Sequence, residues 1–127
     1  LCAAMMQHCE AIGRATHLIN LDPAADNFEY EPSKDIRDLI SVSDVMEEFG
    51  MGPNGGLMFA MEYLVANLEW LKADLGQYQD EFLLVDCPGQ VELYTHSQVI
   101  RTVIDAFRGA DYRVCVVWLV DAAFIGE

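Results

Sequence analysis

The sequence predicts an α/β fold, with a mostly parallel sheet that carries helices on both faces. Three short runs are largely apolar and lack the alternation of a half-exposed strand: 16–21, 82–86 and 114–121. Helical patterns separate these runs along the chain. Buried strands that alternate with helices are typical of a parallel sheet covered on both sides.

Composition and charge limit the possible partners. The 127 residues suffice for one domain or part of one, and 53% of them are apolar, enough for a sizeable core. The net charge is −14, with 21 acidic against 7 basic residues, which disfavours non-specific binding to nucleic acid or anionic lipid. No apolar run reaches the length of a membrane span. We therefore expect no direct nucleic-acid partner and no membrane partner.

The four cysteines show no C-x-x-C spacing, and the three histidines are scattered. This pattern favours reduced thiols in a cytosolic or nuclear protein over a disulfide framework, and it predicts no zinc site.

The first half of the chain predicts a helix over 1–12, stopped by a glycine, and then a strand over 16–21. A loop is expected over 27–34. Two short helices follow over 35–40 and 43–49, because an acidic or hydroxyl residue can cap each of them.

The second half predicts a long helix over 57–75, where leucine and methionine recur at three- and four-residue steps. A strand over 82–86, a helix over 97–108 and a strand over 114–121 follow.

The run Gly52-Pro53-Asn54-Gly55-Gly56 precedes the long helix. Glycines free the backbone, proline stiffens it, and asparagine brings an amide that both donates and accepts hydrogen bonds. The run can therefore present one polar group to a ligand. The alternative is an ordinary turn and helix start.

Each predicted strand finishes with or just before an aspartate: Asp22, Asp86 and Asp121. Ligands of open α/β sheets bind beyond the carboxyl ends of the strands, so three carboxylates there predict a site for magnesium and a nucleotide. The alternative is that each aspartate only ends a strand and caps the next helix.

The segment Asp86-Cys87-Pro88-Gly89-Gln90 follows an apolar strand, as in nucleoside triphosphatases that sense a γ-phosphate. In that pattern the aspartate holds magnesium, the glycine N–H meets the γ-phosphate, and the glutamine orients the attacking water. Glu92 adds a further acceptor nearby, or is a plain surface residue.

Four segments occur here in the order seen in GPN-loop GTPases: 20–24, 35–38, 52–54 and 86–92. The chain resembles this family over essentially its whole length, most closely the third eukaryotic paralogue, with the second as the near alternative. The resemblance implies a three-layer P-loop NTPase-like fold. It also implies that 1–127 is a partial domain, with the P-loop expected before Leu1 and the guanine-reading motif beyond Glu127.

The resemblance also assigns roles to residues. Asp22 matches the family's catalytic aspartate, Asp86 would hold Mg²⁺ with Gly89 beside the nucleotide, and Gln90 and Glu92 would position the water.

By the same resemblance, Asn54 would act in trans, with Gly52 and Pro53 shaping the loop that reaches the neighbouring subunit's nucleotide. Arg37 matches the first switch segment, where it would contact nucleotide, brace the loop or only pair with the acidic surface.

The implied function is Mg²⁺-dependent binding and hydrolysis of GTP by a dimeric switch that supports assembly and nuclear import of RNA polymerase II. The implied partners are the first paralogue in a heterodimer, or a second copy, and RNA polymerase II subunits. The implied location is the cytoplasm, with shuttling to the nucleus as an option. The alternative is a non-catalytic assembly factor in which nucleotide only sets the conformation of the dimer.

Overall fold

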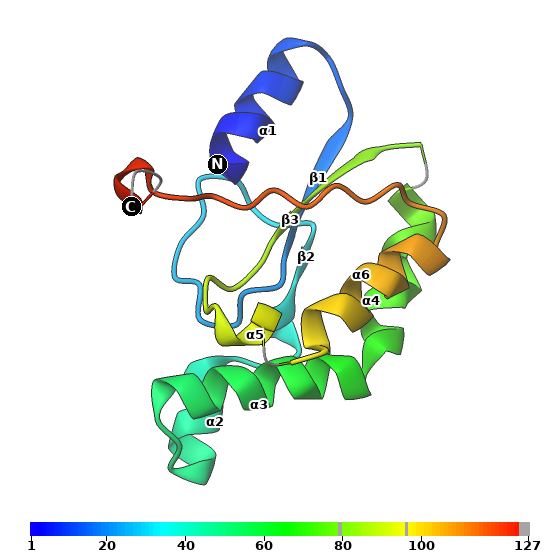
Figure 1. The fold of residues 1–127 in the computed structure, drawn as a ribbon. Helices are drawn as coiled ribbons and strands as arrows, with labels where there is room; N and C mark the ends of the chain where they lie inside the picture. The colour runs from blue at the N-terminus through cyan, green and yellow to red at the C-terminus, as the bar shows by residue number, and fades with distance from the viewer. Residues whose placement is uncertain (79, 96, 125–127) are drawn as a thin grey trace.

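The computed structural model describes residues 1–78, 80–95 and 97–124 (Figure 1). The strands are β1 (Thr16–Asn20), β2 (Lys34–Asp35) and β3 (Phe82–Asp86). The α-helices are α1 (Cys2–Ala11), α2 (Val42–Phe49), α3 (Pro53–Ala66), α4 (Leu68–Leu75), α5 (Glu92–Thr95) and α6 (Val99–Gly109). Three 3₁₀ turns complete the described elements: η1 (Ile36–Asp38), η2 (Gly76–Tyr78) and η3 (Ala122–Phe124).

The three described strands form one parallel sheet in the order β2-β1-β3. β1 pairs with β3 along its whole length, from Thr16 opposite Phe82 to Asn20 opposite Asp86. β2 pairs only with the last two residues of β1. The parallel sheet predicted from the two apolar runs is therefore confirmed, and the carboxyl ends of β1 and β3 lie at the same edge.

Helices cover both faces of this sheet, so the structure has three layers (Figure 1). Helix α1 packs on β1 and β3 from one side. On the other side, side chains of α3, α4 and α6 form the main core with β1. The largest fully buried apolar residues in that core are Ile19, Leu21, Ile36, Met61, Leu64, Leu71, Leu75 and Leu93.

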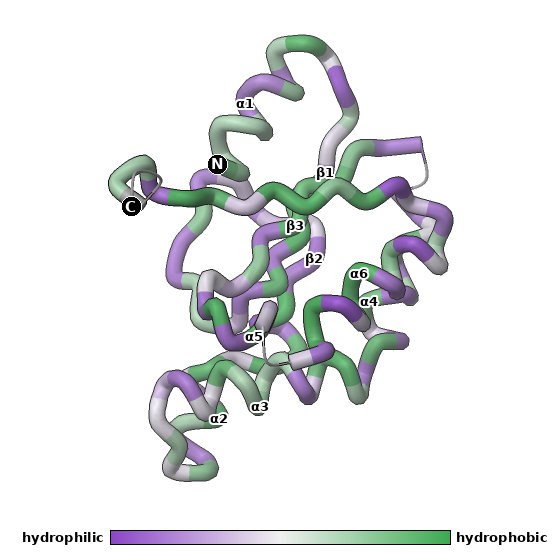
Figure 2. Tube along the Cα trace, viewed as in Figure 1, coloured by the Kyte–Doolittle hydropathy of each residue, from purple (hydrophilic) through white to green (hydrophobic). Residues whose placement is uncertain are grey.

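The predicted strand over 114–121 is not formed. Within the described residues this segment joins no sheet, and its residues from Val116 to Val120 are 52% or more exposed, although they are largely apolar (Figure 2). A strand forms only where a second strand offers a matching row of backbone groups, and no described strand lies in register with this segment. Trp118 makes one aromatic contact, edge-on to Tyr94 with ring centroids 4.9 Å apart.

Two predicted helices also differ from the structure. The expected helix over 57–75 is two helices, because Asn67 leaves the helical conformation at φ −124° and ψ 39°. Its side-chain amide donates to the Tyr63 carbonyl, which ends α3. The expected helix over 35–40 is only the turn η1, because Asp35 still belongs to β2.

Within the described residues, no helix is long and apolar enough to cross a membrane.

Candidate active site at the carboxyl edge of the sheet

Asp22 and Asp86 lie together at the carboxyl edge of β1 and β3. The Leu21 N–H donates to the Asp86 carbonyl at 2.8 Å, which continues the pairing one residue past the strands. Burial, and then the nearby Asp22 carboxylate, raises the pKa of Asp86. The sequence prediction that these two acids share an edge is thus confirmed. Asp121, the third predicted acid, ends no described strand, and its carboxylate accepts from the Ala123 N–H at the start of η3.

Asn20 holds the Asp22 backbone in place, a role that the sequence reasoning missed. Its side chain is fully buried, with a relative exposure of 0%. The amide nitrogen donates to the Asp22 carbonyl at 3.1 Å and to Asp35 Oδ1 at 2.9 Å. The amide oxygen accepts from the Asp22 N–H at 2.9 Å. The signal for this role was a polar residue at the end of a buried strand, because such residues need hydrogen-bond partners.

The Asp22 carboxylate is oriented by its own turn. Its Oδ1 accepts a hydrogen bond from the Ala24 N–H at 3.0 Å. The Val42 N–H donates to the Pro23 carbonyl at 3.2 Å, so this turn is also tied to the start of α2. The turn therefore fixes a half-buried carboxylate beside Asp86.

Arg37 braces the loop that follows Asp22. Its guanidinium pairs with Asp35 through two nitrogens, the shorter contact being 2.6 Å. Its third nitrogen donates to the carbonyls of Ala25 and Asp26, at 3.1 and 2.7 Å. The guanidinium also lies over the Phe28 ring, 5.3 Å from its centroid. Of the three roles that the sequence left open, these contacts match bracing of the loop.

The segment after β3 turns sharply and exposes Gly89 and Gln90. Pro88 is buried, and its carbonyl accepts a hydrogen bond from the Tyr94 hydroxyl at 2.6 Å. A Cβ placed on Gly89 would meet nothing within 4 Å, so the space beside its backbone is open to a ligand. Burial raises the pKa of the Cys87 thiol to about 12, which makes it an unreactive core residue. Glu92 is exposed at the start of α5.

The run that begins at Gly52 opens helix α3 directly. Gly52 is the N-cap residue and Pro53 is the first helical residue, a position that suits proline. Neither Gly55 nor Gly56 has a positive φ. These glycines therefore do not adopt the backbone conformations that only glycine takes easily, in contrast to what the sequence suggested. Gly56 instead allows close packing, because an added Cβ would lie 3.3 Å from Val42 Cγ1.

Asn54 and Gln90 meet in front of this edge. The Gln90 amide nitrogen donates to Asn54 Oδ1 at 3.1 Å, and both residues are exposed. The structure therefore brings together two of the predicted site residues that are far apart in the sequence. This contact lies within one chain, whereas the sequence resemblance assigned Asn54 to a neighbouring subunit's site. The action of Asn54 in trans remains a prediction.

The edge suits a divalent cation and an anionic ligand together. Two neighbouring carboxylates, Asp22 and Asp86, are concentrated there, and burial, with a smaller effect of the Asp22 charge, raises the pKa of Asp86. Mg²⁺ usually takes only one or two protein carboxylates and completes its shell with water and phosphate oxygens. The described residues contain no cluster of three or more ligating side chains. Helix α1 begins near the same edge, since Asp86 also raises the pKa of Cys2, after burial.

Comparison with known proteins identifies the family. The family described as "Conserved hypothetical ATP binding protein" matches residues 1–127. GPN-loop GTPase 3 of Dictyostelium discoideum is 52% identical over 124 residues, which is 98% of this chain and 44% of that protein. GPN-loop GTPase 3 of Danio rerio is 49% identical over 128 residues, 99% of this chain and 45% of that protein.

The chain belongs to the GPN-loop GTPase family. The resemblance stated from its four motifs is therefore confirmed. The chain spans somewhat less than half the length of the curated relatives it matches.

A solved structure agrees with the fold. A GTPase from Pyrococcus abyssi, in its apo form, matches with a TM-score of 0.51 and 26% identity. The match covers 77% of this chain and 40% of that one. The predicted P-loop NTPase-like fold of the GPN-loop family, a parallel sheet between helical layers, is confirmed in the part that the structure describes.

Proposed function

We propose that this chain is part of a GTP-binding domain that hydrolyses GTP in the presence of Mg²⁺. The observation that carries the proposal is that Asp22 and Asp86 lie close together at the carboxyl edge of the sheet. Gln90, four residues after Asp86, is hydrogen-bonded to Asn54. Guanine, rather than adenine, is proposed from the names of the relatives, since the family description itself mentions ATP.

The residues have separate roles in this proposal. Asp86 holds Mg²⁺, which neutralises charge on the phosphates when it is bound. The Gly89 N–H donates to a γ-phosphate oxygen, where the open space beside its backbone admits the ligand. Gln90 and Glu92 orient the attacking water, and Asp22 accepts a hydrogen bond from it. Arg37 holds the loop after Asp22 in place through its contacts with Asp35 and with the carbonyls of Ala25 and Asp26.

We further propose that the full-length protein acts as a dimer, with the first paralogue or with itself. Asn54, presented by Gly52 and Pro53, then meets the γ-phosphate or the water of the other subunit. The exposure of Asn54 supports this role, because its side chain is accessible to a second chain. The proposed role in the cell is support of RNA polymerase II assembly and nuclear import, by a cytoplasmic protein that shuttles to the nucleus.

Hydrolysis assays on the full-length protein with its partner test the reaction. The variants are Asp22→Asn, Asp86→Asn and Gln90→Leu. The control is Asn27→Ala, at an exposed residue of the loop that follows Asp22. We expect each site variant to lose hydrolysis of GTP by about 100-fold or more, while the control keeps it. Equal hydrolysis of ATP and GTP would contradict the choice of guanine, and unchanged activity in Asp22→Asn would contradict the site.

Subunit mixing tests whether Asn54 acts in trans. An Asn54→Ala chain keeps its own carboxylates, and an Asp22→Asn chain keeps its own Asn54. If Asn54 acts on the neighbouring subunit, mixed dimers contain one complete site, and the mixture recovers activity that neither variant has alone. If Asn54 acts within its own chain, as the Gln90 contact would allow, the mixture stays inactive.

The alternative is a switch whose turnover is incidental. The double variant Gln90→Leu with Asn54→Ala separates the two functions. If it loses hydrolysis but still supports client assembly, the non-catalytic function is correct. If both are lost together, turnover is required.

A further inference from the structure

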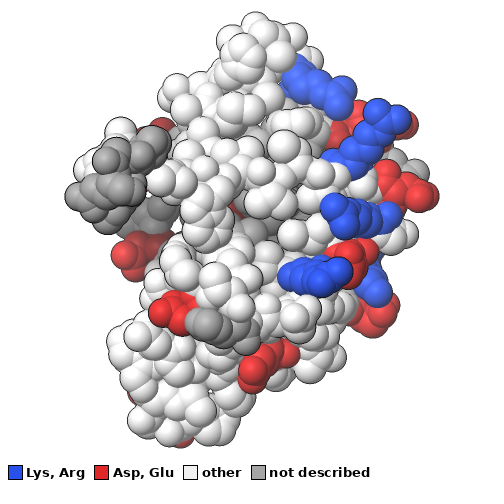
Figure 3. Space-filling view, in the orientation of Figure 1, with Lys and Arg blue, Asp and Glu red and all other residues white. Residues whose placement is uncertain are grey.

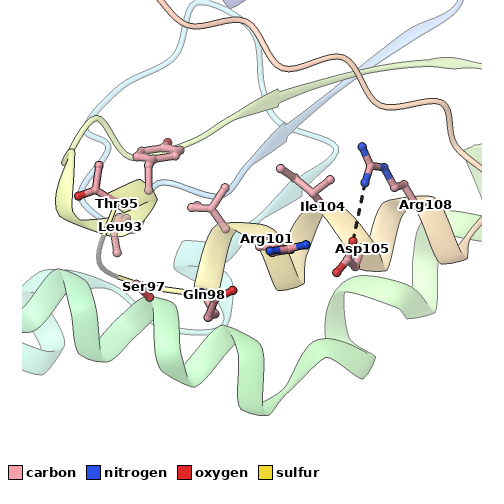
Figure 4. A pocket seen from close by; sticks show the side chains of 10 residues that line it. Leu93, Thr95, Ser97, Gln98, Arg101, Ile104, Asp105 and Arg108 are labelled. Carbon is pink, nitrogen blue, oxygen red and sulfur yellow. Dashed lines mark ion pairs between the residues drawn. The ribbon is translucent and has the colours of Figure 1, made fainter.

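An open groove lies between α5 and α6 (Figure 4). Its volume is about 350 Å³, which is enough for a few side chains but small for a whole cofactor. Its apolar wall consists of Leu93, Tyr94, Ile100 and Ile104. Leu93 and Ile100 are buried, while Tyr94 and Ile104 are partly exposed, so the groove offers apolar contact area to a ligand.

Two arginines border this apolar wall. Arg101 and Arg108 lie on the same face of α6, seven residues apart, with Ile104 between them. Asp105 also borders the groove, 3.9 Å from Arg108, but both of those side chains are more than 60% exposed. An ion pair so exposed contributes little, so Arg108 can turn to another carboxylate. Arg101 is exposed and forms no ion pair within the described residues.

This basic border stands out in a chain of net charge −14 with only 7 basic residues. Lys34 pairs closely with Asp74 and Arg37 with Asp35, whereas the pairs of Lys72 with Glu69 and of Arg108 with Asp105 are long and exposed. The basic side chains visible in Figure 3 gather along one edge of the molecule, with acidic side chains among them. Lys72 continues this basic edge, because a second hollow beside the groove is lined by both Lys72 and Asp105.

We propose that this groove binds a short acidic segment of a partner protein. One or two apolar side chains of the segment fill the space between Tyr94 and Ile104, and its carboxylates lie beside Arg101 and Arg108. The apolar wall disfavours a bare phosphate, which has no apolar group to place there. The overall negative charge of this chain repels acidic partners elsewhere, so the two arginines fix where and in which register the segment binds.

None of the proposed catalytic residues lines the groove, but Tyr94 connects the two. Its ring lines the groove, its hydroxyl donates to the Pro88 carbonyl, and burial, followed by the nearby Cys87, Asp22 and Asp86, raises its pKa to about 12. The proposal therefore does not depend on hydrolysis of GTP, and a binding assay without nucleotide tests it.

The experiment selects peptides from a random 12-residue display library on the immobilised full-length protein. The selected peptide is then labelled with fluorescein, and its affinity is measured by anisotropy. We expect the selected sequences to combine aspartate or glutamate with leucine, isoleucine or phenylalanine. The double variant Arg101→Glu with Arg108→Glu should weaken binding about tenfold or more, since two attractive charge pairs become repulsive.

A matched variant controls for net charge. Arg14→Glu with Arg113→Glu makes the same change of charge at two exposed arginines that do not line the groove, and it should leave the affinity unchanged. Thermal melting of both double variants shows whether each remains folded. The proposal is wrong if the selected peptides are not acidic or if the two double variants weaken binding equally. It is also wrong if no peptide is selected, which is the result expected if another segment of the full-length chain fills the groove.

Discussion

The Gln90 amide nitrogen lies 3.1 Å from Asn54 Oδ1, and this hydrogen bond joins the segment after β3 to the first turn of α3. The two residues are 36 positions apart. A ligand that moves the Gly89–Gln90 segment must therefore either break the hydrogen bond to Asn54 or move Asn54 with the segment. The pair is a direct connection between two of the four segments, 52–54 and 86–92, on which the family resemblance was based.

Loss of this pair should affect turnover far more than stability. Because both side chains are exposed, Asn54→Ala and Gln90→Ala should each change the free energy of unfolding by less than about 1 kcal/mol. Their coupling in a double-mutant cycle should be below about 0.5 kcal/mol. Hydrolysis of GTP should nevertheless fall about 100-fold in Gln90→Ala. Urea unfolding and single-turnover kinetics on the full-length protein measure the two effects. A large loss of stability would show that the bond is structural.

Asn20 should be the most sensitive polar residue at the site. Asn20→Ala removes three hydrogen bonds in a fully buried position and should destabilise the protein by about 2–4 kcal/mol. Asn27→Ala, at an exposed asparagine, should change stability by less than about 0.5 kcal/mol. Equal unfolding midpoints in urea for the two variants would contradict the proposed role of Asn20.

Two adjacent glycines should respond in opposite directions. An added Cβ at Gly56 would lie 3.2 Å from Met46 Cγ and 3.3 Å from Val42 Cγ1, so Gly56→Ala forces α2 and α3 apart. We expect a loss of about 1 kcal/mol after the gain in helix propensity is included. At Gly55 the nearest atom is 3.9 Å away, and Gly55→Ala should stabilise the helix by about 0.5 kcal/mol. Thermal melting distinguishes the signs.

Asp35 should make stability depend on pH in the acid range. Burial alone would raise its pKa, but hydrogen bonds from Arg37 and Asn20 outweigh burial and lower it. Because the folded-state pKa lies below that of the unfolded chain, this contribution is complete above about pH 4. It is lost as the pH falls through the folded-state value.

The measurement for Asp35 is the difference in unfolding free energy between the wild type and Asp35→Asn. That difference should be constant from pH 7 to about pH 5 and should shrink below about pH 4. In an Arg37→Ala background the pH dependence should weaken, because the main partner of the carboxylate is gone. A difference that grows as the pH falls would contradict the direction of the shift.

Local sequence patterns predicted two of the three expected strands correctly. The apolar runs at 16–21 and 82–86 became β1 and β3, which pair in parallel, although none of the residues of β3 is buried. Asp22 and Asp86 followed from the same reasoning, because the end of a buried strand fixes where the next side chain lies.

The remaining features depend on contacts between distant residues, which no local pattern contains. The apolar stripe of 57–75 continues across Asn67, so periodicity could not locate the break between α3 and α4. The two residues of β2 are polar and form a strand only because β1 is beside them. The contact between Gln90 and Asn54 joins two segments that the sequence could assign only separately.

The segment 116–120 has a consequence for handling the protein. It combines valine, tryptophan and leucine with no charge and no proline, and it pairs with none of the described strands. Such a segment readily pairs with an identical copy of itself, as in the tightly interdigitated sheets of amyloid fibrils. Any species that leaves it uncovered should aggregate as its concentration rises, which light scattering can follow. A charged substitution such as Val117→Lys should suppress this self-association.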